Sequence, residues 1–377
     1  MNIADQFTGA LTGIRSLAAL MVLAHHIFAV AGPRVLFFDI GNAQITFHWL
    51  LTVSWLGANA FFVLSGFLLA IPFARHIENK GGPVRVGAYL IRRVKRVAPA
   101  YWLQIVILVI VLYFSSALPD WRVIAAHFLF LQNFWPNFAF SLNGVYWTLP
   151  TEFGYYLLLP IFAACAARCI DNKRVAWLAL SVALIITAVA YRWFMFTKIA
   201  NEPVSTKFFV LLQLPGVIDH FAIGMLLAWV YVRFSGFVSS RMSDALVVVG
   251  LSGLVAMMAL FDHVYADYWS GHVLLFIGYT ITALFIGALV LGAALSGPIA
   301  RILFANRAML FVGTISYSLY LWHLPIIRWT IPMLDHFAVT GDRLWWLVVI
   351  AVPLSFLAAT ISFYFIERPF MAQKSRV

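Results

Sequence analysis

Long apolar stretches alternate along the chain with short segments that hold most of its charged residues. Each apolar stretch runs for about 17–25 residues, the length an α-helix needs to cross a bilayer. We place the spans at Ile14–Val30, Trp49–Phe73, Ala98–Leu118, Tyr146–Ala167, Val175–Phe196, Phe208–Val232, Ala245–Phe261, His272–Leu295, Met309–Trp329 and Leu344–Ile366. A shorter apolar piece, Val123–Leu131, predicts an interfacial or re-entrant helix between spans 3 and 4. The pattern predicts an all-α, polytopic transmembrane bundle of about ten spans.

Composition excludes a soluble protein. Of the 377 residues, 63% are hydrophobic and only 10% are charged, whereas soluble domains carry about 25% charged residues. The net charge of +11 would also fit a nucleic-acid-binding protein. If the N-terminus is cytoplasmic, however, most of the basic residues fall on one side of the membrane, as the positive-inside rule requires. We therefore predict an N-in, C-in protein of the cell inner membrane with no nucleic-acid partner.

No stretch of the chain has the composition of a separate soluble domain. We expect a single integral-membrane domain over residues 1–377, without a soluble C-terminal domain. The first apolar stretch follows a weakly charged start and lacks a convincing small-residue cleavage site, so it predicts a retained span rather than a signal peptide.

Two ionisable residues mark the first span, where Gly13 to His26 reads GIRSLAALMVLAHH. An ionisable group inside a bilayer costs about 2.5–3.5 kcal/mol and is a functional candidate by default. Arg15 and His26 are separated by about 16 Å along a helix. The span would therefore carry a cation near its cytoplasmic end and an imidazole toward the other side.

Glu152 and His323 fall at the same depth as His26, roughly 6–10 Å below the outer surface. A carboxylate and an imidazole in one layer can hold each other's proton, as a general base requires. The alternative is a hydrogen-bonded group that only fixes packing, which for His323 is an equally good interpretation. Asp219, beside His220 in the middle of the sixth span, could pair with Arg15 or with a substrate hydroxyl.

A basic cluster, RRVKR at Arg92–Arg96, stands at the entrance of the third span and is followed by Pro99. Arg93 and Arg96 are three residues apart, so they share a helix face and could clamp phosphates. The alternative is an anchor that touches only lipid headgroups.

Six ordered motifs together resemble the integral-membrane acyltransferase family 3. They are Arg15 with His26 in GIRSLAALMVLAHH, FFVLSGFL at Phe61–Leu68, Arg93, Arg96 and Pro99 in RRVKRVAPAYW, Trp147, Glu152 and Tyr156 in YWTLPTEFGYY, Tyr317 and His323 in ISYSLYLWHLP, and FIERPF at Phe365–Phe370.

The resemblance implies an O-acyltransferase that moves an acyl group, by default acetyl, from cytoplasmic acyl-CoA to a hydroxyl of a cell-surface or exported glycan. Acetyl-CoA would be the donor substrate, no metal would be needed, and the partners would be a glycan or glycolipid acceptor and membrane lipids. His26 and Glu152 are then the catalytic candidates, and Arg15, Arg93 and Arg96 serve the CoA side. The supporting candidates are Trp147, Tyr156, Asp219, Tyr317 and His323.

A competing interpretation is a proton-coupled transporter or flippase for a lipid-linked glycan, with Asp219, His220 and Glu152 carrying protons. The lack of obvious internal repeats weakens it, because many transporters are built from repeated halves. A purely structural membrane protein is a third possibility, which would leave the layer of His26, Glu152 and His323 without a purpose.

Overall fold

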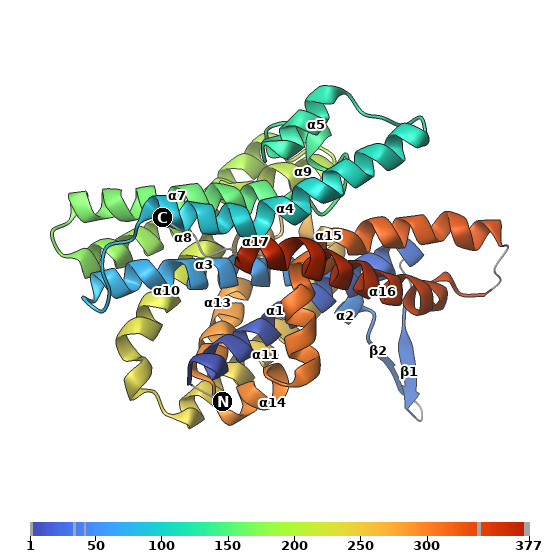
Figure 1. Ribbon diagram of the computed structural model, residues 1–377. Coiled ribbons are helices and arrows are strands. Elements are labelled where there is room, and N and C mark those ends of the chain that lie inside the picture. Colours follow the sequence, from blue (N-terminus) through green and yellow to red (C-terminus); the bar gives the residue numbers. More distant parts are fainter. Residues whose placement is uncertain (1–2, 33–34, 41–42, 338–340, 373–377) are drawn as a thin grey trace. The chain divides into compact units, whose positions relative to one another are not determined.

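The computed structural model describes residues 3–32, 35–40, 43–337 and 341–372. Among these residues, ten helices are long and apolar enough to cross a membrane, which confirms the predicted helical class and number of spans (Figure 1). The ten spanning segments are Gly9–Ala31, Trp49–Ile77, Val86–Phe114, Thr148–Cys169, Lys173–Ile199, Leu214–Phe237, Ser240–His263, Val273–Leu295, Arg307–His336 and Arg343–Ala372.

The individual elements follow one another along the chain with few long connections. The α-helices are α1 Ile3–Ala31, α2 Trp49–Thr52, α3 Gly57–Ile77, α4 Val86–Phe114, α5 Trp121–Phe128, α6 Pro136–Ala139, α7 Thr148–Cys169, α8 Lys173–Ile199, α9 Val204–Leu211, α10 Leu214–Phe234, α11 Ser240–His263, α12 Tyr265–Tyr268, α13 Val273–Leu295, α14 Pro298–Phe304, α15 Arg307–His336, α16 Arg343–Ser362 and α17 Arg368–Ala372. A π-helical turn, η4, covers Phe363–Glu367.

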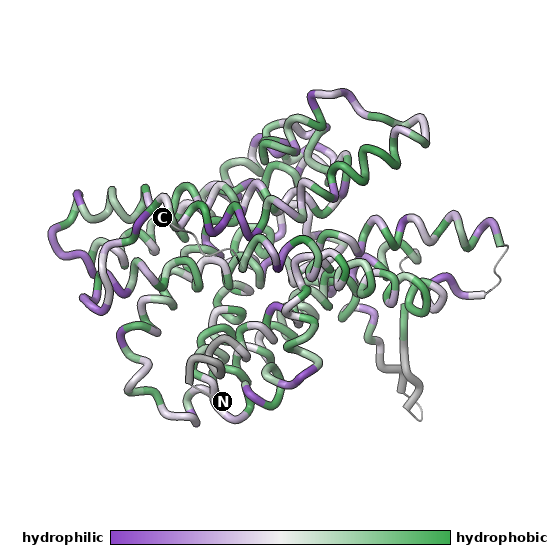
Figure 2. Tube along the Cα trace, in the orientation of Figure 1, coloured by the Kyte–Doolittle hydropathy of each residue, from purple (hydrophilic) through white to green (hydrophobic). Residues whose placement is uncertain are grey.

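Hydropathy is distributed as a multi-pass membrane protein requires. Apolar residues predominate along the long helices, and strongly hydrophilic residues gather mostly at helix ends and connections (Figure 2). The short helix α5 lies where Val123–Leu131 predicts one. The hydropathy pattern gave no sign of a small antiparallel hairpin, in which β1 (Phe37–Ile40) pairs with β2 (Ala43–Thr46).

Two predicted boundaries are wrong, each for a physical reason. Helix α4 begins at Val86 rather than Ala98, so the basic cluster lies within the helix and Pro99 in its interior. Hydropathy marks where a helix enters apolar surroundings, not where its backbone hydrogen bonds begin. The stretch Phe208–Val232 is divided between α9 and α10, and a proline occupies the first turn of α10. Proline lacks the N–H for an intrahelical bond, and in the first turn of a helix that bond is absent anyway, so a helix that begins just before Pro215 loses no hydrogen bond.

The chain divides into two compact units. Unit 1 comprises Met1–Ala18, Leu56–Val86 and Gly154–Thr314, and unit 2 comprises Ala19–Trp55, Gly87–Phe153 and Ile315–Val377. The prediction of a single domain stays a prediction.

In unit 1, α10 packs against α3, α8 and α13. The contact with α3 depends on two glycines. A Cβ at Gly224 would lie 2.4 Å from the carbonyl oxygen of Val63, and a Cβ at Gly66 would lie 2.4 Å from that of Phe221. Small residues let membrane helices approach closely where no hydrophobic effect drives them together.

One end of unit 1 is held by a buried carboxylate and three donors, the Glu78 clamp (Glu78, Arg174, Trp229 and Arg233). Arg174 grips both oxygens of Glu78, with Nε at 2.8 Å and an Nη at 3.1 Å. Trp229 Nε1 and Arg233 each donate to the carboxylate at 2.9 Å. The clamp gathers the end of α3, the start of α8 and the end of α10, three helix ends that the predicted topology places on the same side of the membrane.

Replacing Glu78 should lower stability in a pH-dependent way. Burial acts to raise the pKa of Glu78, but the hydrogen bonds from Trp229, Arg233 and Arg174 outweigh it, and the pKa lies below its ordinary value. Such a carboxylate stabilises the fold above its unfolded-state pKa of about 4.3 and loses that contribution as pH falls through the folded-state pKa. We expect Glu78→Gln to cost about 1–2 kcal/mol at pH 7, because the arginines are partly exposed.

Thermal unfolding in detergent between pH 3.5 and 8 would measure this effect. The two unfolding midpoints should differ at neutral pH and converge as the pH falls below 4. Glu202→Gln, at an exposed position, is the matched control and should change little. A Glu78→Gln protein as stable as wild type at pH 7 would contradict the role of the clamp.

Candidate functional site

The catalytic candidate of the first span, His26, meets the histidine of the ninth. His26 Nδ1 lies 2.9 Å from the carbonyl oxygen of Val22, one helical turn earlier in α1. The same nitrogen lies 3.1 Å from His323 Nε2 on α15, and the ring centroids are 5.0 Å apart. His323 Nδ1 in turn lies 3.0 Å from the carbonyl oxygen of Leu319. All four residues belong to unit 2.

The backbone bonds assign the protons of this histidine pair (His26 and His323). A carbonyl oxygen only accepts hydrogen bonds, so Nδ1 of each neutral ring carries the hydrogen and Nε2 carries the lone pair. His26 Nδ1–H is then shared between the Val22 carbonyl and His323 Nε2. His26 Nε2 makes no hydrogen bond to any other described residue. The pair thus presents one basic nitrogen that no described residue hydrogen-bonds, which is what a general base or nucleophile requires.

Buried amides hold α15 in place next to His323. Gln104 Nε2 on α4 and Asn143 Nδ2 both donate to the carbonyl oxygen of Leu321, at 2.7 and 3.0 Å. Tyr146 Oη donates to Gln104 Oε1 at 2.6 Å. The hydropathy pattern did not single out these residues, although Gln104 carries a usable signal as a polar amide deep inside an apolar span.

Glu152 lies in the same unit as His26, and Tyr320 connects it to the neighbourhood of the histidine pair. Thr148, one turn earlier on α7, lies with its Oγ1 2.7 Å from Tyr320 Oη. Glu152 interacts electrostatically with Tyr320 and with Tyr89. The Tyr320 ring is 5.9 Å from that of His323. The side chain bonded to His26 is thus His323, and a direct action of Glu152 on His26 stays a prediction.

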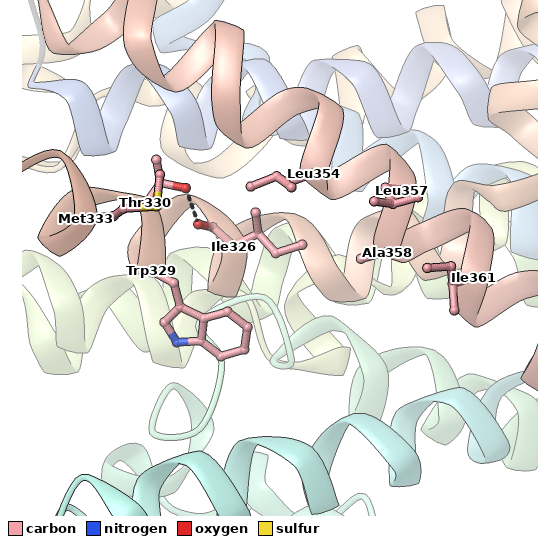
Figure 3. A pocket seen from close by; sticks show the side chains of 8 residues that line it. All are labelled: Ile326, Trp329, Thr330, Met333, Leu354, Leu357, Ala358 and Ile361. Carbon is pink, nitrogen blue, oxygen red and sulfur yellow. Dashed lines mark hydrogen bonds between the residues drawn. The ribbon is translucent and has the colours of Figure 1, made fainter. Parts of the chain in front are cut away.

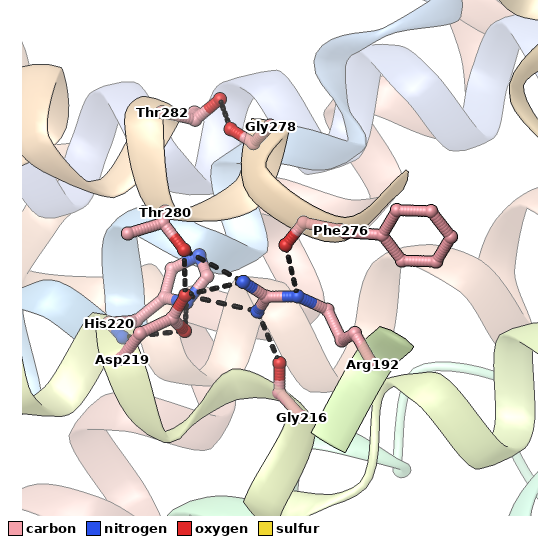
Figure 4. A network of polar contacts seen from close by, with 8 residues as sticks. All are labelled: Arg192, Gly216, Asp219, His220, Phe276, Gly278, Thr280 and Thr282. Atoms are coloured by element: carbon pink, nitrogen blue, oxygen red, sulfur yellow. Dashed lines mark hydrogen bonds and ion pairs between the residues drawn. The ribbon is translucent and has the colours of Figure 1, made fainter. Parts of the chain in front are cut away.

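Asp219 belongs to a closed network in unit 1 and pairs with Arg192 of α8, not with Arg15, which was one of the two partners that the sequence suggested (Figure 4). Arg192 donates to Asp219 Oδ2 from both Nη atoms at 3.0 Å, and Thr280 donates to the same oxygen at 2.6 Å. His220 Nδ1 lies 2.8 Å from Asp219 Oδ1. Asp219 is the sixth residue of α10 rather than the middle of a span, because the helix starts at Leu214.

Arg192 is the residue that sequence reasoning missed here, although a charge within the fifth apolar stretch was a visible signal. A guanidinium has five N–H donors. Besides its bonds to Asp219, Arg192 donates to the carbonyl oxygens of Phe276 and Gly216 at 2.8 and 2.6 Å and to Thr280 Oγ1 at 2.7 Å. All five donors are used, so the network has the character of a structural core.

The two arginines predicted to bind phosphate lie on one side of α4. Arg93 and Arg96 are half-buried, whereas Arg92 is exposed. Arg93 Nε is buried without a hydrogen-bond partner among the described residues. Arg96 lies 3.7 Å from Glu367 at the end of η4, and Glu367 also accepts a hydrogen bond from Ser318. The FIERPF motif therefore supplies a carboxylate to Arg96.

The other predicted site residues, Arg15, Trp147, Tyr156 and Tyr317, lie in different parts of the structure. Arg15 is half-buried on α1, near Gly13, where a Cβ would lie 1.9 Å from the Phe304 carbonyl oxygen. Tyr156 is buried on α7. The Trp147 carbonyl accepts a hydrogen bond from Asn133 at 2.7 Å, and Tyr317 Oη donates to the Val97 carbonyl at 2.8 Å. Their roles in binding stay predictions.

An apolar groove of about 310 Å³ lies between α15 and α16 in unit 2 (Figure 3). Trp329 and Met333 line it from α15, and Leu354 and Ile361 line it from α16. The hydroxyl of Thr330 in its wall donates to the carbonyl of Ile326 at 2.8 Å, within its own helix. Such a lining suits hydrocarbon chains, not a polar substrate.

Comparison with known proteins agrees with the motifs. The chain is 25% identical to the peptidoglycan O-acetyltransferase OatA of Listeria monocytogenes over 97% of its own length and 56% of the relative's. It is 23% identical to the putative peptidoglycan O-acetyltransferase YrhL of Bacillus subtilis, over 98% of the chain and 56% of the relative. The chain is also 25% identical to a putative O-acetyltransferase of Staphylococcus aureus, over 97% of the chain and 57% of the relative.

The chain thus spans little more than half the length of these curated relatives. No solved structure matches it. The family model described as an acyltransferase domain matches residues 8–366, nearly the whole chain. With that coverage, the protein belongs to the family of membrane acyltransferases that this domain defines.

Proposed function

We propose that the chain is an O-acetyltransferase that takes an acetyl group from acetyl-CoA on the cytoplasmic side and delivers it to a hydroxyl of a cell-envelope glycan. The observation that carries the proposal is the free Nε2 of His26, whose other ring nitrogen is held by the Val22 carbonyl and by His323. Membership of an acyltransferase family supplies the reaction class. The names of the relatives suggest peptidoglycan as the acceptor.

In the proposed reaction, His26 Nε2 takes the proton of the acceptor hydroxyl as its oxygen attacks the thioester carbonyl. Collapse of the tetrahedral intermediate breaks the carbon–sulfur bond. The proton on Nε2 then passes to the departing thiolate, so that free CoA and the acetyl ester are formed and His26 is regenerated. In a two-step route the same nitrogen would attack the thioester first and expel the CoA thiolate, forming an acetyl-histidine. The acceptor hydroxyl would then attack the acetyl-histidine, which frees the imidazole, and its proton would pass to the thiolate.

The donor side of the proposal uses Arg93 and Arg96 of unit 2, and the role of Arg15, which belongs to unit 1, stays a prediction. Charge-assisted hydrogen bonds from guanidinium groups suit the phosphates of CoA. Arg93 Nε has no hydrogen-bond partner among the described residues. The predicted N-in, C-in topology in the inner membrane would direct Arg93 and Arg96 toward cytoplasmic CoA.

The transporter interpretation has less support. It needs titratable groups that exchange protons along a path, and Asp219 is instead held by hydrogen bonds from Arg192, His220 and Thr280. The family membership also favours group transfer over transport.

Replacing His26 tests the proposed base. We expect His26→Ala to reduce acetyl transfer by about 10²–10⁴-fold, because general base catalysis typically contributes that much. Purified protein in liposomes would be assayed for free thiol released from acetyl-CoA and for acetyl esters on a chito-oligosaccharide acceptor. His127→Ala, a buried histidine of α5, is the control. Wild-type activity in a folded His26→Ala protein would contradict the assignment.

Replacing Arg93 tests the donor site. We expect Arg93→Gln to raise the KM for acetyl-CoA about tenfold with little change in kcat, since one charge-assisted hydrogen bond contributes roughly 1.5–3 kcal/mol. Acetyl-CoA should also raise the unfolding temperature of this variant less than that of wild type. Arg92→Gln, on the exposed side of α4, is the matched control. Equal KM values in all three proteins would exclude Arg93 from the donor site.

A further inference from the structure

We propose that His323 is a positioning residue and proton relay for His26, holding the Nδ1 hydrogen of His26 and accepting it during transfer. The inference rests on the proposed function, in which His26 Nε2 acts as the base. It assigns to a second histidine the part that a carboxylate plays in many hydrolases and transferases.

The donor and acceptor roles follow from the two backbone bonds. His323 Nδ1 is 3.0 Å from the Leu319 carbonyl, which fixes its hydrogen there and leaves a lone pair on Nε2. That lone pair faces His26 Nδ1 at 3.1 Å. His26 Nδ1–H also faces the Val22 carbonyl at 2.9 Å, so its hydrogen is shared between two acceptors and the two bonds hold the ring in one orientation.

The same geometry provides a route for charge. When His26 Nε2 takes the acceptor's proton, the Nδ1 proton can move to His323 Nε2. His26 is then neutral with its hydrogen on Nε2, and His323 is the imidazolium, with its Nδ1–H still on the Leu319 carbonyl. Delivery of the Nε2 proton to the thiolate reverses the shift. One proton enters and one leaves, and no other reactant is needed.

A pair of imidazoles also suits the membrane. In the resting state both rings are neutral, whereas a carboxylate in the same place would bring a full charge into the bilayer at about 2.5–3.5 kcal/mol. His323 is completely surrounded, with 1% of its surface exposed. The titratable and charged groups that face the pair are His25 on α1, Tyr320 and Arg328 on α15, and Glu152 through Tyr320 on α7.

Two replacements of His323 separate a relay from simple packing. His323→Gln keeps an acceptor oxygen near the position of Nε2 but cannot take up a proton, and His323→Leu keeps much of the volume without any acceptor. At metal sites, removing the hydrogen-bond partner of a histidine's second nitrogen typically lowers metal affinity or activity by about 10–100-fold. We expect a loss of kcat of that order in His323→Leu. The KM for acetyl-CoA should stay unchanged, and His323→Gln should recover part of the kcat.

The pH–rate profile gives a readout that packing would not move. With the Val22 carbonyl left as the one acceptor described for its Nδ1–H, the imidazolium of His26 is less stable, so activity of His323→Leu should persist to lower pH than that of wild type. His127→Gln is the matched control, because His127 Nδ1 makes the same type of bond to the Val123 carbonyl at 2.7 Å. Burial lowers the pKa of His127 to about 4. Replacing His127 therefore removes no group that titrates between pH 5 and 9, and the pH profile of this control should match that of wild type.

The inference is overturned if folded His323→Leu and His323→Gln proteins lose equal activity with a wild-type pH profile, or if His127→Gln loses as much as His323→Leu. It is also overturned if both His323 variants keep wild-type kcat. Full activity of His26→Ala would instead remove the proposed base itself, so the two failures are distinguishable. Partial recovery in His323→Gln with a displaced profile in His323→Leu supports the relay.

Discussion

A neutral imidazole has one N–H donor and one basic nitrogen with a lone pair. At His26 the N–H donates to a backbone carbonyl of the same helix. The bond from Nδ1 to the Val22 carbonyl is local to α1 and forms in any helix that holds this ring in this rotamer. Contact with His323 then adds a second acceptor for the same hydrogen. The free nitrogen of His26 is therefore a product of backbone geometry, and the amides that fix α15 at Leu321 keep the second histidine in reach of it.

Hydropathy predicted how many helices cross the membrane because each crossing must supply about 20 apolar residues. It failed where backbone chemistry, not transfer energy, determines the outcome. The sixth apolar stretch is interrupted between α9 and α10, just before a proline in the first turn of α10. The charged residues before Pro99 are helical because charged side chains do not interrupt backbone hydrogen bonds. Strands β1 and β2 were invisible to a criterion built on apolar length.

Depth along a helix could be counted from the sequence, but the partner of each polar residue could not. His26, Glu152 and His323 were assigned to one layer, and the structure joins the two histidines within it. Counting residues could not choose between Glu152 and His323, because that choice depends on which helices are neighbours and how each is rotated about its axis. Asp219 shows the same limit, since its partner Arg192 lies on a helix that depth alone gave no reason to prefer over α1.

The Asp219 network has a consequence for how the sequence can vary. Arg192, Asp219 and Thr280 hydrogen-bond to one another in a closed triangle of side chains. Loss of one partner leaves an uncompensated buried charge, while apolar replacement of all of them together is often tolerated. The three positions, on α8, α10 and α13, therefore form one unit of substitution. In an alignment of related sequences we expect residues 192, 219 and 280 to covary.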